Sequence, residues 1–184
     1  MGMGGCGPFG RLSKPERRRT MWALTVGVLV QLRLFLSLER RMRRSGGPGI
    51  IPFELAGAPE RATRIMDTWG PAGRSAARHS LLLDYAFPPT YASLQALGCT
   101  ATAEAAAERG RRALAAWGGP MAWGQVAAAG FDYIENTALL LILAGRDGSL
   151  PALARRAALA KFALLFTGWG YMLLGVRRRD RHVA

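Results

Sequence analysis

The segment Pro120–Ala144 reads PMAWGQVAAAGFDYIENTALLLILA, and its length and composition decide the class of fold. As an α-helix it exceeds the ~20 residues that cross the hydrocarbon core of a bilayer, and most of its side chains are apolar. Three other segments have similar length and character, at residues 20–38, 80–102 and 157–176. The four segments together predict an all-α fold, that of a polytopic membrane protein.

The connections between the four segments are short enough for neighbouring helices to run in opposite directions. We therefore expect an antiparallel four-helix transmembrane bundle. The first connection contains residues 59–69, where Ala62, Ile65, Met66 and Trp69 fall on one face of a helix and charged residues on the other. This stretch is too short to cross a bilayer, and it predicts a short amphipathic helix on the membrane surface.

Charge is separated from the apolar segments along the chain. The 184 residues include 25 Lys and Arg against 12 Asp and Glu, a net charge of +13, and the mean hydropathy is only +0.09 although half the residues are hydrophobic. The arginines form runs at residues 17–19, 40–44 and 177–179, beside apolar segments. Such runs are typical of helix ends held at anionic lipid headgroups, so we expect a bilayer and not a nucleic acid as partner.

The same separation sets the domain organisation. We expect a basic, disordered N-terminal tail at residues 1–19, a single membrane domain at 20–176 and a basic C-terminal tail at 177–184. Lys and Arg are almost equally numerous on the two sides of the predicted bundle, but the densest runs beside the spans lie in the tails. This distribution predicts a multi-pass protein of the cell membrane with both termini in the cytoplasm.

The sequence contains no pattern for a metal or a nucleotide cofactor. Its two cysteines, Cys6 and Cys99, are far apart, and its two histidines, His79 and His182, share no ligand spacing with them. A glycine-rich phosphate loop, a dinucleotide fingerprint and a zinc-protease motif are all missing from the sequence. We therefore predict no metal and no cofactor.

Each predicted span carries an ionisable residue, although a charge in hydrocarbon costs at least ~2.5–3.5 kcal/mol. At ~1.5 Å per residue, Arg33, Asp84 and Lys161 lie about 6–8 Å inside the same side of the bilayer, and Glu135 lies deeper at about 14 Å. Asp132 lies near the midplane. Two cations and three carboxylates thus fall in one half of the membrane, which predicts a convergent polar layer.

A helix break adjoins this layer. Pro88 and Pro89 cannot donate backbone hydrogen bonds, which frees the carbonyl groups of Asp84 and Tyr85. Membrane proteins often build polar sites at such breaks. The tyrosines next to the acids are expected to donate hydrogen bonds to them. The predicted binding site comprises Arg33, Asp84, Tyr85, Asp132, Tyr133, Glu135, Asn136 and Lys161, and the candidate catalytic residues are Asp84, Asp132 and Glu135.

Three functions are compatible with this layer. The first is small proton-linked transport, in which Glu135 or Asp132 exchanges a proton for a cation or polar solute; a homodimer would serve it, because four helices enclose little lumen. The second is an enzyme acting on a lipid or isoprenoid, with Asp132 or Glu135 as base and a tyrosine or protonated Asp84 as acid. The third is an assembly or scaffold protein in which the charges pair only to fix helix order.

Overall fold

The computed structural model describes residues 7–146 and 148–176 of the chain, and within this part every regular element is an α-helix. The all-α prediction is therefore confirmed. The predicted basic tail at residues 177–184 lies outside the described residues. The helices are α1 (Lys14–Arg44), α2 (Ile50–Glu54), α3 (Pro59–Asp84), α4 (Phe87–Glu108), α5 (Arg112–Ala116), α6 (Gly118–Leu143) and α7 (Leu150–Val176).

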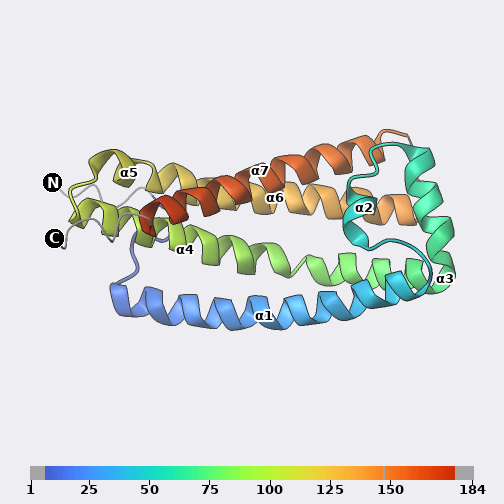
Figure 1. The fold of residues 1–184 in the computed structure, drawn as a ribbon, viewed down its shortest axis with the longest axis horizontal. Helices are drawn as coiled ribbons and strands as arrows, with labels where there is room; N and C mark the ends of the chain where they lie inside the picture. Colours follow the sequence, from blue (N-terminus) through green and yellow to red (C-terminus); the bar gives the residue numbers. More distant parts are fainter. Residues whose placement is uncertain (1–6, 147, 177–184) are drawn as a thin grey trace, which may run out of the picture.

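The long helices α1, α4, α6 and α7 extend along the long axis of the molecule, and successive ones run in opposite directions (Figure 1). Helix α6 packs against both α4 and α7, whereas α1 packs against α3 and α4. The short helix α5 lies at one end of the long helices, and α2 with the first part of α3 lies at the other (Figure 1). The functional site described below forms where α2 meets α6 and α7.

Three segments are long and apolar enough to span a membrane: α1, residues 112–143 with α5 and α6, and α7. No residue in the most apolar stretch of α1 is fully buried by the rest of the protein. Its residues Val26, Leu29 and Val30 are each more than half exposed. A contiguous apolar surface of this kind is rare on soluble monomers and is typical of a surface that contacts lipid or another protein.

The predicted second span, residues 80–102, is not a continuous helix and is not one of the three candidate spans. Helix α3 ends at Asp84, and α4 begins at Phe87. Proline in the first turn of α4 explains the break, because Pro88 and Pro89 lack the N–H groups that would continue the hydrogen bonding of α3. The segment is therefore formed by two helices that meet at the polar layer.

The predicted amphipathic helix at residues 59–69 is the first part of the longer helix α3. The chain turns at Gly70, whose φ of 57° and ψ of −168° are not helical, and then continues to Asp84. The helix is therefore interrupted directly after Trp69, where the sequence predicts the end of the amphipathic helix. Pro71 follows the turn directly and is placed as the first residue of a new helical segment, where proline is tolerated.

We expect Gly70→Ala to destabilise the protein by about 1–3 kcal/mol, because this backbone region is accessible essentially to glycine alone. The space around Gly70 is open, so steric contact of the added Cβ contributes nothing. The matched control is Gly130→Ala in α6, where the space is also open but the backbone is helical. The control should leave stability unchanged or raise it slightly. Equal unfolding midpoints for the two variants in detergent would show that the backbone at Gly70 does not need glycine.

Helix α1 begins earlier than the predicted start at residue 20. The Glu16 carboxylate accepts hydrogen bonds from the backbone N–H and the hydroxyl group of Ser13, at 2.9 and 2.6 Å, which caps the helix. Residues 14–19 of the predicted disordered tail are therefore helical. Arg17 is buried and forms a two-pronged ion pair with Glu104 of α4, so it is bound within the protein instead of facing headgroups.

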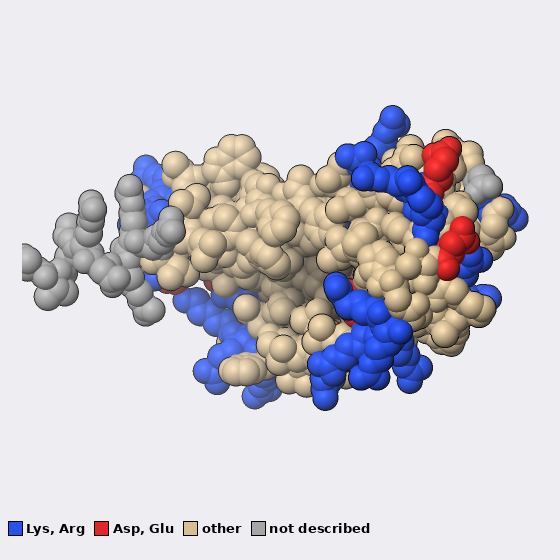
Figure 2. All heavy atoms as spheres, turned by 45° about the vertical axis from the view of Figure 1, so that its right-hand side comes forward, with Lys and Arg blue, Asp and Glu red and all other residues tan. Residues whose placement is uncertain are grey.

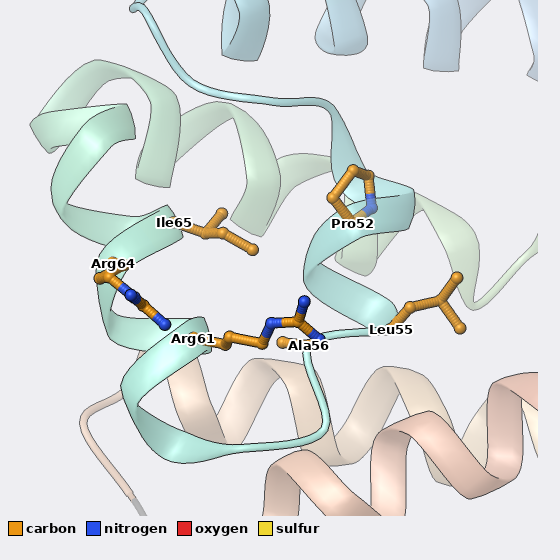
Figure 3. Close-up of a pocket in the computed structure, with 6 residues that line it drawn as sticks. All are labelled: Pro52, Leu55, Ala56, Arg61, Arg64 and Ile65. Carbon is orange, nitrogen blue, oxygen red and sulfur yellow. The ribbon is translucent and has the colours of Figure 1, made fainter.

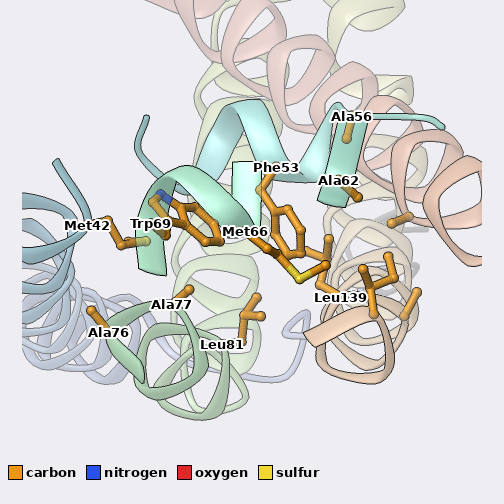
Figure 4. Packing of buried hydrophobic residues seen from close by; sticks show 13 residues of the cluster. Met42, Phe53, Ala56, Ala62, Met66, Trp69, Ala76, Ala77, Leu81 and Leu139 are labelled. Carbon is orange, nitrogen blue, oxygen red and sulfur yellow. The ribbon is translucent and has the colours of Figure 1, made fainter. Parts of the chain in front are cut away.

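A hydrophobic core gathers where α2 and α3 cover the ends of α6 and α7 (Figure 4). Its largest member, Trp69, is 1% exposed and lies 5.0 Å from Phe53 of α2 between ring centroids. The indole N–H of Trp69 donates to the carbonyl oxygen of Pro48 at 2.5 Å. These contacts hold α2 against the longer helices and fix the position of its last residue, Glu54.

Candidate functional site

Lys161 of α7 lies at the centre of the buried ionisable side chains. Its Nζ atom is 3.1 Å from Oδ1 of Asp132 and 2.6 Å from Oε2 of Glu135. All three side chains are buried, and Glu135 is 0% exposed. Asp132 and Glu135 are three residues apart on α6, which places them on the same face of the helix, towards α7. One ammonium group therefore binds two carboxyl groups.

Tyr91 of α4 belongs to the site, although the sequence analysis did not include it. Its hydroxyl group donates to Oδ2 of Asp132 at 2.8 Å. Asp132 thus receives one hydrogen bond from Lys161 and another from Tyr91, and both are buried. Because the two donors come from different helices, Asp132 ties α6 to both α4 and α7.

Asp84 is the last residue of α3 and approaches the site from the helix break. Its carboxyl group lies near the side chain of Asn136 and within electrostatic range of Asp132 and Lys161. Asn136 is 1% exposed and follows Glu135 on α6. The structure therefore brings Asp84 and Asn136 close to Lys161 and its two acids.

Glu54 of α2 is a fourth acid in the cluster, and the sequence analysis missed it because it lies in the connection between two predicted spans. Its side chain contacts that of Glu135 and interacts electrostatically with Lys161. Burial raises the pKa of Glu54, and the nearby Lys161 ammonium only partly offsets this effect. The apolar residues Ile50, Ile51 and Phe53 beside it were the available signal that part of this connection packs on the helices, and of the three Phe53 is buried.

The cluster contains more acid than base. Four carboxyl groups, from Glu54, Asp84, Asp132 and Glu135, share the single ammonium of Lys161. Complete ionisation would leave a net charge of −3 in a buried region, which is unfavourable at low dielectric. The contact between the Glu54 and Glu135 carboxyl groups is a place where two acids can share one proton. The cluster therefore combines four carboxyl groups with one ammonium group.

The backbone carbonyl groups at the helix break accept hydrogen bonds from side chains of other helices. The hydroxyl of Tyr133 donates to the carbonyl oxygen of Tyr85 at 3.3 Å, and the amide of Gln31 on α1 donates to that of Ala86 at 3.0 Å. The Tyr85 hydroxyl pairs with that of Thr137 at 2.7 Å. The two tyrosines therefore stabilise the break, and neither donates to the acids as the sequence analysis expected.

Arg33 does not join the cluster. It is exposed on α1 and makes no ion pair with any described residue. The prediction of two cations in the layer is therefore wrong for this residue. The physical reason is the arrangement of the helices, because α1 packs against α3 and α4 and not against the α6–α7 face that carries Asp132 and Lys161.

The arrangement provides buried carboxyl groups beside one lysine, and buried groups of this kind can bind and release protons. Among the described residues, no group of three or more His, Cys, Asp or Glu side chains is arranged to hold a metal. No family model, no curated protein and no solved structure matches this chain.

Proposed function

We propose that this chain is an integral protein of the cell membrane in which α1, α4, α6 and α7 form an antiparallel four-helix transmembrane bundle. Two features support this proposal. Large apolar side chains are exposed along the long helices, for example Leu29 of α1 and Leu173 of α7, both at 61%. Most of the Lys and Arg side chains visible in Figure 2 lie towards the two ends of the molecule, and the surface between them is mostly uncharged, as expected of a surface in contact with hydrocarbon.

The topology follows from an even number of crossings, which puts both termini on one side of the membrane. The proposal places that side in the cytoplasm, because the exposed Arg18 and Arg19 lie directly before the apolar part of α1. Arg33, which is exposed within α1, has a long side chain that can extend its guanidinium group towards the headgroups. The other exposed arginines at residues 40–44 contact the opposite headgroup layer.

The function proposed for the buried cluster is small proton-linked transport. The observation that carries this proposal is the excess of acid: four carboxyl groups surround one lysine, and the cluster adjoins the interrupted α3–α4 helix. Interrupted helices next to ionisable groups are a recurrent way to build ion and substrate sites in transporters. Intramembrane acids also commonly mark proton relays.

In this mechanism a proton and a cationic cargo compete for the same negative charge. The pair formed by Glu54 and Glu135 holds a proton in the resting state, whereas Asp132 stays bound to Lys161 and Tyr91. Arrival of a cation favours ionisation of the pair, so the proton leaves as the cargo binds. A homodimer would provide the lumen that four helices alone do not enclose.

The test uses proteoliposomes with an entrapped pH-sensitive dye. An imposed pH gradient should drive proton movement when Na⁺, K⁺ or ethylammonium is added outside, at a rate above that of empty vesicles. Glu135→Gln removes the exchangeable proton and should abolish this response, because glutamine cannot ionise. The matched control is Glu60→Gln, which removes an exposed acid of α3 outside the cluster and should transport normally.

The competing interpretation is a structural role for the cluster, which is favoured for Asp132 by its two hydrogen-bond donors. The two interpretations differ in what Glu135→Gln does to a folded protein. Transport requires loss of proton flux with an unchanged unfolding midpoint and elution profile. A parent protein that moves no protons with any of the three cations would overturn the transport proposal.

A further inference from the structure

A cavity lies between α2 and the first turns of α3, outside the charged cluster (Figure 3). Its volume is about 400 Å³, within the range of roughly 300–1,000 Å³ that is usual for small-molecule sites. Most of its wall is apolar, and its only charged lining residues are two arginines. It is lined by Pro52, Leu55, Ala56, Arg61, Arg64 and Ile65.

The guanidinium groups of Arg61 and Arg64 have no partner among the described residues. Neither side chain forms an ion pair or a hydrogen bond, and Figure 3 shows the Arg61 side chain extending across the cavity towards Ala56. Asp67, a carboxylate on the same helix, is already bound by Arg74 at 2.6 Å. Two unpaired cations thus stand beside an apolar wall.

A third arginine extends this positive region. Arg155 of α7 packs against Gly57 in the turn between α2 and α3, where an added Cβ would lie 2.7 Å from its Cδ atom. Arg155 is exposed and has no ion pair with the described residues. The cavity is therefore bordered by three arginines without an ion pair among the described residues, which attract an anion before it binds.

We infer that this cavity binds the phosphate-bearing end of a lipid, with the phosphate held by Arg61 and Arg64 and the adjoining hydrocarbon against Pro52, Leu55 and Ile65. Arginine binds phosphate through two parallel N–H donors, which gives both strength and orientation. A free phosphate ion would leave the apolar wall of the cavity without a binding partner. An uncharged lipid would leave both guanidinium groups without a binding partner.

The inference goes beyond the proposed function and does not depend on transport. It links to the cluster only through α2, because Leu55 and Pro52 line the cavity while Glu54 contacts Glu135. A bound lipid would therefore hold α2 in place from one side while the cluster holds it from the other. Substitution of Glu54 separates the two sites experimentally.

The experiment titrates dioctanoyl phosphatidic acid into the full chain in an uncharged detergent, and native mass spectrometry measures the bound fraction. The parent protein should bind one lipid saturably. Arg61→Gln together with Arg64→Gln should weaken binding at least about tenfold, because two charge-assisted contacts to phosphate are lost. Both residues are exposed, so the doubly substituted protein should keep its helix content by circular dichroism.

Three controls define the outcome. Arg41→Gln with Arg44→Gln removes two exposed arginines at the same spacing and should bind like the parent. Glu54→Gln should also bind like the parent, whatever it does to transport. Inorganic phosphate and dioctanoylglycerol, at the same concentrations, should not displace the bound lipid. Equal weakening by both arginine pairs, or full displacement by inorganic phosphate, would overturn the inference, because either result indicates general attraction of anions.

Discussion

Lys161→Met is expected to lower the free energy of unfolding by about 3–5 kcal/mol at pH 8, the usual cost of removing one partner from a buried ion pair. The loss arises because two negative charges lose their cation: that of Asp132, 3.1 Å from the ammonium, and the one that Glu135, at 2.6 Å, shares with Glu54. Both acids are buried, so water cannot replace the lost partner. Methionine is chosen because it fills a similar volume without charge.

The loss of stability caused by Lys161→Met, measured as free energy of unfolding, should become smaller as the pH falls. Burial raises the pKa of Glu54 above its unfolded value, so the stability that its neutral form contributes is present below about 4.3 and is lost as the pH rises through the folded value. Without Lys161, the ionised form of Glu54 loses its main attractive interaction with a positive charge. The stability of the variant should therefore decrease more steeply with rising pH than that of the parent. At pH 5 the variant should therefore be closer to the parent than at pH 8.

Unfolding by SDS in mixed micelles, followed by circular dichroism at the two pH values, measures this difference. The control is Lys14→Met, which removes a lysine from an exposed pair with Glu108, both partners being more than 60% exposed. It should have little effect, because exposed pairs are screened by solvent. A Lys161→Met protein as stable as the parent at pH 8 would show that the acids are neutral there and need no cation.

Trp69→Ala is expected to destabilise the protein by about 3–5 kcal/mol, the cost found when a large aromatic residue is removed from a core. The side chain is 1% exposed and packs on Phe53, and its N–H group is bonded to the Pro48 carbonyl. The cavity left behind would loosen α2, which carries Glu54. The thermal unfolding midpoint in detergent should fall accordingly.

Two variants make this second prediction specific. Trp69→Phe retains an aromatic ring against Phe53 but loses the hydrogen bond to Pro48, so its effect should be intermediate. Trp22→Ala removes a tryptophan that is 67% exposed on α1 and should change the midpoint much less. If Trp22→Ala and Trp69→Ala were equally destabilising, the core formed by α2 and α3 would not be the main support of this end of the molecule.

Local features of the sequence were sufficient for several parts of the site. The spacing of Asp132 and Glu135 puts both on one face of a helix whatever the neighbouring helices are. Pro88 and Pro89 interrupt backbone hydrogen bonding by their own chemistry, and the structure has its break at the residues just before them. Counting residues from the ends of the segments 157–176 and 120–144 placed Lys161 in the same half of the bilayer as Asp132 and Glu135.

Other parts could not be obtained in this way, since they depend on which helices are neighbours. Arg33 and Lys161 lie at similar depth in their segments, yet only Lys161 faces the acids, because α7 packs on α6 whereas α1 packs on α3 and α4. Tyr91 reaches Asp132 only because α4 also contacts α6. The packing of the helices sets the rotation of each helix about its own axis. When a segment is apolar on all sides, the periodicity of its sequence says little about which face is buried.

By itself, the sequence determined that the chain is all-α, that several of its helices are long and apolar enough to enter a bilayer, and that acids and a lysine lie within them. Only the tertiary structure decided that Glu54 joins the cluster, that Arg33 does not, and that the acids outnumber the cations four to one. The physical reason is that helix formation and chain breaks depend on adjacent residues, whereas a charge cluster depends on the folding of a connecting segment, here α2, over helices far along the chain.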